Sequence, residues 1–183
     1  MHSLIDYIGS MITGGAVFIM MVSYYTSISA TAIMQVFNST TQEDVTSITE
    51  VIEYDFRKAG YRVTDSVAFA TIDSNSVALR GDYDNNGTMD TVKYWLSSEL
   101  IPGAESSSAK TLYRREGNST VRLTTNGVSR FRIWYYDRDG NATSAKKSVQ
   151  FARIALHVEG KLSYDGERAS AYWERLLKPQ NVR

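Results

Sequence analysis

Apolar residues fill the first part of the chain without the alternation that a half-exposed element shows. Between Tyr7 and Gln42 there is no Asp, Glu, Lys or Arg, and residues 8–33 are rich in Ile, Met, Val, Phe, Ala and Tyr. This run exceeds the roughly 20 residues that a helix needs to cross the core of a bilayer. We therefore expect residues from about 4 to 35 to form an apolar helix that is buried in lipid or in protein.

The pattern becomes amphipathic from Glu43 onward. Apolar side chains recur there at spacings of three and four residues, which places them on one face of a helix. These are Val45, Ile48, Ile52, Phe56 and Ala59. Charged residues occupy mostly the other positions: Glu50, Glu53, Asp55, Arg57 and Lys58. Gly60 suits the C-terminal cap, so we expect a helical region over residues 1–60, weakest at Asn38-Ser-Thr-Thr.

After Gly60 the chain consists of short β-branched and aromatic runs separated by Gly, Asn, Asp and Ser, a pattern typical of strands and turns. Strands are predicted near residues 67–72, 76–80, 91–96, 111–115, 120–124, 128–136, 149–158 and 171–177. Asn126-Gly127 predicts a tight hairpin turn between the fifth and sixth strands. The sequence therefore predicts an α+β protein with an antiparallel β domain over residues 61–183.

Composition excludes some classes of function. The 20 basic and 20 acidic residues balance, and without a long basic run the chain lacks the electrostatic footprint of a nucleic-acid binder. The absence of cysteine excludes disulfides and thiolate chemistry. A cleavable secretory signal begins with a basic region, and no Lys or Arg precedes the apolar run. We therefore expect the segment to be retained and to be buried in lipid or in protein.

Catalytic motifs are sparse. The histidines are His2 and His157, and neither lies near a nucleophile motif. The sequence has no glycine-rich phosphate loop, metalloprotease helix or dinucleotide fingerprint. We expect that the protein is not an enzyme and that it requires no cofactor.

One stretch matches the start of a calcium loop, because side-chain oxygens stand at its first, third, fifth and ninth positions and glycine at its sixth. The four candidate ligands are Asp82, Asp84, Asn86 and Asp90. Lys93 stands at the twelfth position, where a calcium loop has a bidentate glutamate. The other interpretation is a turn whose side chains bond their own backbone, the more common role of Asp, Asn and Gly. A similar, shorter sequence over residues 137–141 is interpreted as a turn.

Four Asn-x-Ser/Thr sequences match the pattern of a glycosylation acceptor. They begin at Asn38, Asn86, Asn118 and Asn141. Because Asn, Ser and Thr are frequent in polar turns, turn composition is the preferred interpretation.

Asp6 is the sole charged residue before Glu43. An ionised acid deep in a bilayer costs roughly 2.5–3.5 kcal/mol on insertion scales, so such residues tend to have partners and functions. Two interpretations remain open. Asp6 lies at the headgroup surface at little cost, or it pairs with the terminal amine of a neighbouring copy.

Both ends of the chain resemble the type IV pilin-like proteins, which include the pseudopilins of type II secretion. Ser3-Leu4-Ile5-Asp6 is similar to the Thr-Leu-Ile-Glu segment that opens a mature pilin, with Asp6 at the place of the family's glutamate. Residues 55–61 resemble the helix end of the larger minor pilins, the W and J types, and residues 172–182 resemble their last strand.

The resemblance implies that the amphipathic half of the helix packs on the antiparallel sheet. It also implies a structural subunit of a pilus or pseudopilus that assembles with other pilin-like subunits through its apolar helix. Such a subunit is a single-pass inner-membrane protein before assembly and part of a filament at the cell surface afterwards. Asp6 would then neutralise the N-terminus of a neighbour.

A tethered extracytoplasmic binding module is the alternative function. In that case the helix is only an anchor, and the strand domain binds a ligand or a wall polymer. The aromatic residues considered for such a site are Tyr83, Tyr94, Trp95, Trp134, Tyr135 and Tyr136.

Overall fold

The structure, a computed structural model, describes residues 2–63, 67–164 and 166–182. In these ranges it has one helix followed by strands, which confirms the predicted α+β class. The elements are α1 (His2–Lys58), β1 (Phe69–Ile72), β2 (Ser76–Gly81), β3 (Asp90–Leu100), β4 (Lys110–Glu116), β5 (Ser119–Arg122), β6 (Gly127–Tyr136), β7 (Phe151–Glu159) and β8 (Ser170–Leu177).

The chain divides into two compact units, Met1–Phe37 and Asn38–Arg183. Helical hydrogen bonding continues through Asn38-Ser-Thr-Thr, so α1 has no break there. Helix residues 38–58 belong to the second unit because their apolar side chains are part of its core. The first unit contains most of the uncharged part of α1, which continues to Gln42 in the second unit.

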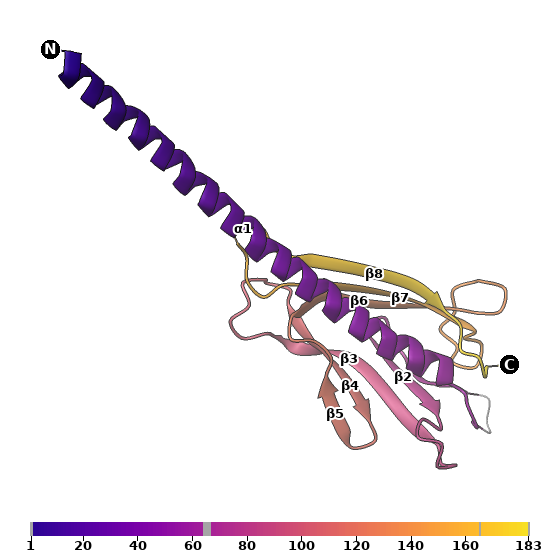
Figure 1. The fold of residues 1–183 in the computed structure, drawn as a ribbon. Coiled ribbons are helices and arrows are strands. Elements are labelled where there is room, and N and C mark those ends of the chain that lie inside the picture. The colour runs from indigo at the N-terminus through magenta and orange to yellow at the C-terminus, as the bar shows by residue number, and fades with distance from the viewer. Residues whose placement is uncertain (1, 64–66, 165, 183) are drawn as a thin grey trace. The chain divides into compact units, whose positions relative to one another are not determined.

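All strands pair antiparallel in one sheet, in the order β1-β2-β3-β4-β6-β7-β8, with β5 paired to β4 outside this path (Figure 1). The part of α1 that belongs to the second unit lies across this sheet (Figure 1). Ile52 and Phe56 of α1 pack there with apolar side chains such as Leu79 and Ile154, all of them less than 2% exposed. Burial of this face explains the apolar spacings of three and four residues before Gly60, and the period changes after Gly60 because the chain continues as strands.

The end of α1 is confirmed near Gly60. This glycine has a φ of 83°, a left-handed conformation that residues with a side chain rarely adopt, as is common just after a helix. Its N–H donates to the carbonyl of Arg80 at 2.8 Å. A Cβ at this position would also lie 2.9 Å from the carbonyl oxygen of Asn181. The helix therefore ends where three segments of the second unit meet.

The predicted hairpin at Asn126-Gly127 is wrong, because β5 pairs with β4 and not with β6. All four side chains of β5 are exposed, so it has no apolar face to hold it beside β6 over the core. The N–H of Asn126 instead donates to the Asp44 carboxylate of α1 at 3.3 Å. Gly127 serves a close approach, since a Cβ there would lie 2.4 Å from the Cβ of Ala109.

A buried ion pair joins α1 to the sheet. Asp55 was predicted on the charged side of the helix, yet it is 0% exposed. Its two carboxylate oxygens accept hydrogen bonds from Nε and Nη2 of Arg114 at 2.7 and 3.1 Å, and the hydroxyl of Tyr94 also donates to it. Burial, followed by the charge of Asp55, raises the pKa of Tyr94 well above its ordinary value, which keeps the hydroxyl a donor.

Candidate functional site

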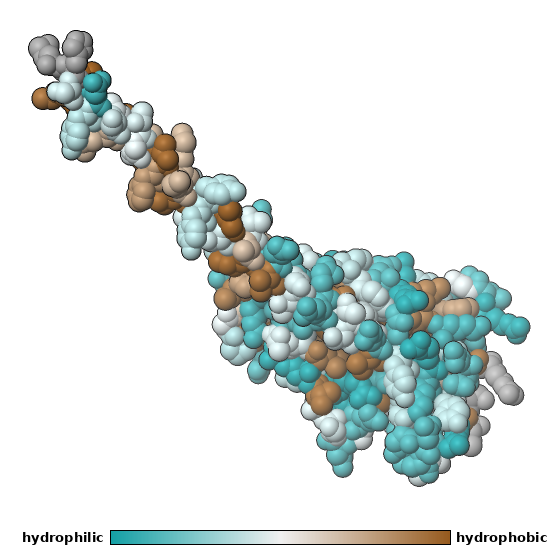
Figure 2. Space-filling view, in the orientation of Figure 1, coloured by the Kyte–Doolittle hydropathy of each residue, from teal (hydrophilic) through white to brown (hydrophobic). Residues whose placement is uncertain are grey.

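The uncharged part of α1 exposes apolar side chains on every side. Four consecutive residues, Phe18 to Met21, are each 66–69% exposed, and consecutive residues of a helix lie about 100° apart. Exposed apolar side chains also flank them from Leu4 to Val36, and Figure 2 shows several of them in brown. Among the described residues, this helix is long and apolar enough to cross a membrane by length and composition.

Asp6 lies in α1 directly before this uncharged part, and its side chain is exposed. The hydroxyl of Ser10 donates to the backbone carbonyl of Asp6 at 2.8 Å, and no hydrogen bond or ion pair to its carboxylate comes from the described residues. Met1 lies outside the described residues. Within the single chain Asp6 is therefore a carboxylate available to a second molecule.

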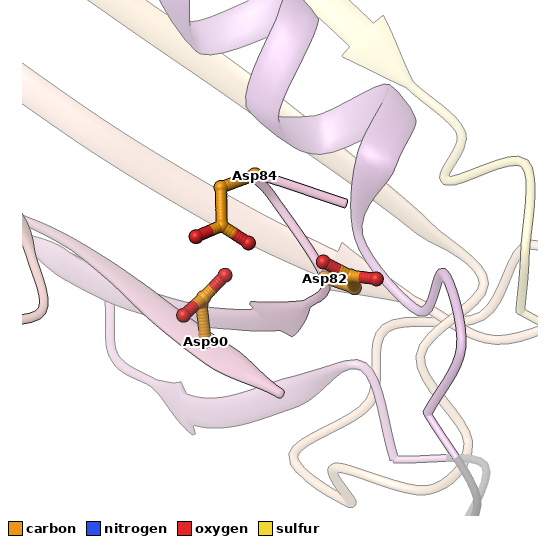
Figure 3. A group of neighbouring side chains, drawn as sticks. All are labelled: Asp82, Asp84 and Asp90. Atoms are coloured by element: carbon orange, nitrogen blue, oxygen red, sulfur yellow. The ribbon is translucent and has the colours of Figure 1, made fainter. Parts of the chain in front are cut away.

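Three of the four predicted metal ligands lie together in the turn between β2 and β3. Asp82 and Asp84 belong to the turn, and Asp90 is the first residue of β3. One carboxylate oxygen from each lies within 4.8 Å of the others. Figure 3 shows a carboxylate oxygen of Asp82 directed toward Asp84 and Asp90. The spacing in the sequence thus corresponds to a cluster in space.

Asp82 is the buried member of this cluster, with 1% of its surface exposed. Its Oδ2 accepts hydrogen bonds from Nη1 of Arg62 at 2.7 Å and from the N–H of Gly87 at 3.0 Å. Burial raises the pKa of Asp82, but these two donors, the charge of Arg62 and the nearby N–H of Asn85 together hold it below its ordinary value. Asp82 is therefore an anion near neutral pH.

The fourth predicted ligand, Asn86, has a different place in the turn. Its Nδ2 donates to Oδ2 of Asp84 at 2.6 Å, and its N–H donates to Oδ1 of Asp84 at 3.0 Å. Its Oδ1 accepts from the N–H of Thr88 at 2.7 Å. Lys93, at the twelfth position, lies with its ammonium group 5.6 Å from the centroid of the Trp95 ring. Because its side chain bonds within the turn, Asn86 is a weaker ligand candidate than the three aspartates.

The four glycosylation candidates are all exposed. Asn86, Asn118 and Asn141 lie in the connections between strands, whereas Asn38 lies within α1. Asn86 is also bonded to Asp84, as described above.

A hydroxyl, an imidazole and a carboxylate meet on β6 and β7, a grouping that the sequence did not reveal. Nδ1 of His157 lies 2.6 Å from Oγ of Ser129 and 3.4 Å from Oε1 of Glu159. In a catalytic triad the hydroxyl and the carboxylate contact different ring nitrogens, whereas here both contact Nδ1. The three side chains therefore form a contact between the neighbouring strands β6 and β7, as side chains on one face of a sheet commonly do. The side chain of His2 lies outside what the structure describes.

The aromatic residues considered for a ligand site do not form one surface. Tyr83, Tyr94 and Tyr135 are 0–8% exposed and belong to the core. Trp95 of β3 stacks on Tyr113 of β4, with ring centroids 5.6 Å apart. Trp134 lies beside Arg132 and Arg153. Tyr136 borders a surface hollow with Phe151 and Leu176. Their roles are mainly packing and cross-strand contact.

Comparisons with protein-family models, with curated proteins and with solved structures give no match.

Proposed function

We propose that the protein is a structural subunit of a pilus or pseudopilus filament, which assembles through the apolar part of α1. One observation carries this proposal: α1 presents apolar side chains on all sides between Leu4 and Val36, with no charge beyond Asp6 before Glu43. A surface this apolar is unfavourable in water and must be covered by lipid or by protein.

The length of the uncharged segment favours protein as well as lipid. Its 36 residues from Tyr7 to Gln42 correspond to about 54 Å of helix, whereas the hydrocarbon core of a bilayer is about 30 Å thick. A simple anchor needs only about 20 of these residues. Side-by-side packing of the same segment from several copies would bury all of it.

Asp6 supports the same assignment. A carboxylate near the start of an apolar helix is costly among apolar neighbours unless an opposite charge accompanies it. The terminal amine of an adjacent copy supplies that charge in a filament. Before assembly the subunit is a single-pass protein of the inner membrane. The second unit (residues 38–183), here called the sheet unit, forms the outer surface of the assembled filament.

Electron microscopy of material sheared from cells tests the proposed function. We expect filaments in that fraction, and we expect mass spectrometry to find this chain and its mature N-terminus in them. A chain recovered only from membranes, in cells whose sheared fraction holds no filaments with it, would contradict the proposal and favour the tethered binding module.

Replacing Asp6 by alanine should reduce filament yield by about tenfold or more while the protein still inserts in the membrane. Removal of one partner from a buried charge pair costs about 3–5 kcal/mol, because the other charge stays unpaired, and 1.4 kcal/mol is about tenfold in an equilibrium. The measurement is the ratio of sheared to membrane-bound protein by immunoblot. Asp6→Glu is the matched control and should assemble. Equal yields from Asp6→Ala and the unmodified chain would remove this role of Asp6.

A further inference from the structure

We propose that Asp82, Asp84 and Asp90 form a calcium site in the turn between β2 and β3. The carrying observation is Oδ1 of Asp82, which is buried and accepts no hydrogen bond from the described residues, although the N–H of Asn85 lies near this carboxylate. Asp82 directs a carboxylate oxygen toward Asp84 and Asp90 (Figure 3). A buried anionic oxygen without a donor destabilises the fold, and a cation in this place would supply its missing partner.

A turn held only by its own hydrogen bonds does not account for this oxygen. Oδ2 of Asp82 is engaged by Arg62 and Gly87, and both oxygens of Asp84 accept from Asn86. Oδ2 of Asp90 accepts from the N–H of Tyr83 at 3.0 Å. The three described side-chain atoms that are buried without a partner are Oδ1 of Asp82 and the Nε atoms of Arg153 and Arg168, so the acceptor among them lies at this cluster.

The chemistry of the cluster selects calcium. Carboxylate oxygens are ligands for hard divalent cations, and the described residues of this turn bring no nitrogen or sulfur ligand into the group. Calcium accepts six to eight oxygens in a flexible geometry, whereas magnesium demands a near-ideal octahedron and retains its waters. Asp84 is exposed and Asp90 is half-buried, which leaves room for water to complete the shell.

The position of the site couples it to the packing of α1. The N–H of Asp82 donates to the carbonyl of Tyr61 at 3.1 Å, and the ammonium of Lys58 donates to the carbonyl of Tyr83. Arg62, which pairs with Asp82, lies in the turn after α1, which ends at Lys58. A cation that fixes the turn therefore also fixes the contact between the end of α1 and the sheet.

Thermal unfolding of the full chain in detergent tests the proposal, with CaCl2 added to protein first treated with a chelator. We expect 10 mM calcium to raise the Tm by about 5 °C or more, if the dissociation constant is about 10⁻⁴ M, as in extracellular calcium modules. The same concentration of MgCl2 should give a clearly smaller increase. Isothermal titration calorimetry with CaCl2 should show about one site per chain.

Two variants make the test specific. Asp84→Asn keeps the size of an exposed side chain and removes one ligand charge, so it should fold and lose most of the calcium-dependent increase. Asp139→Asn is the matched control, because it makes the same change at an exposed aspartate in another turn, and it should keep the full increase. No increase in the unmodified chain, an equal increase in Asp84→Asn, or an equal effect of magnesium would each overturn the calcium site.

Discussion

Replacing Arg114 by methionine should lower the free energy of unfolding of the sheet unit by about 3–5 kcal/mol. The substitution leaves the carboxylate of Asp55 buried at 0% exposure without its bidentate partner. Desolvation of an unpaired charge is the reason for the size of the effect. Denaturant unfolding of the full chain in detergent, followed by tryptophan fluorescence, measures it, because Trp95, Trp134 and Trp173 all lie in the sheet.

An exposed ion pair between α1 and the sheet provides the matched control. Nη1 of Arg175 on β8 contacts Oε1 of Glu53 on α1, but 58% of the Arg175 side chain is exposed. Arg175→Met should therefore change the free energy of unfolding by about 1 kcal/mol or less. The double variant Asp55→Leu/Arg114→Met should recover part of the loss, because neither charge remains buried. Equal small effects of Arg114→Met and Arg175→Met would show that the buried pair does not stabilise the packing of α1.

Exchanging residues 4–35 for an unrelated transmembrane helix of about 20 residues should abolish filaments without removing the protein from the membrane. An unrelated apolar helix satisfies the bilayer by length and hydropathy alone. It does not reproduce the side-chain packing, the extra length or the Asp6 carboxylate through which copies of α1 would contact one another in the proposed filament. The readouts are sheared filaments by electron microscopy and membrane-bound protein by immunoblot.

The control for this exchange keeps residues 4–35. It replaces only exposed polar residues of the sheet unit, such as Ser98 and Glu99. This variant should form filaments if the apolar helix drives assembly. Filaments from the exchanged chain at normal yield would instead show that α1 acts only as an anchor, which is the behaviour expected of the tethered binding module.

The apolar helix and the positions of the strands could be predicted because both follow from local patterns. The sequence itself shows a run without charges. It also shows apolar spacings of three and four residues before Gly60 and short β-rich runs after it. The prediction that Asp55 lies on the charged side of the helix was wrong. Asp55 stands three residues after Ile52 and four before Ala59. This spacing places Asp55 on the buried face, and it was the available signal for a buried ion pair.

The candidate cation site was half visible in the sequence. The spacing of Asp82, Asp84 and Asp90 indicated calcium-type ligands, since a short turn brings alternate residues together. The sequence could not show that Asp82 is buried with an unpartnered oxygen, because its contacts with Tyr61 and Arg62 join segments about 20 residues apart.

The sequence by itself determined the uncharged apolar segment, the amphipathic half of α1 and the locations of the strands, because hydrophobic periodicity is set by neighbouring residues. Only the tertiary structure decided that β5 pairs outside the main path, that Gly127 allows a close approach to Ala109, and that Asp55 meets Arg114 across 59 positions of sequence. These contacts depend on which distant segments share a core, and that choice results from the packing of the whole second unit.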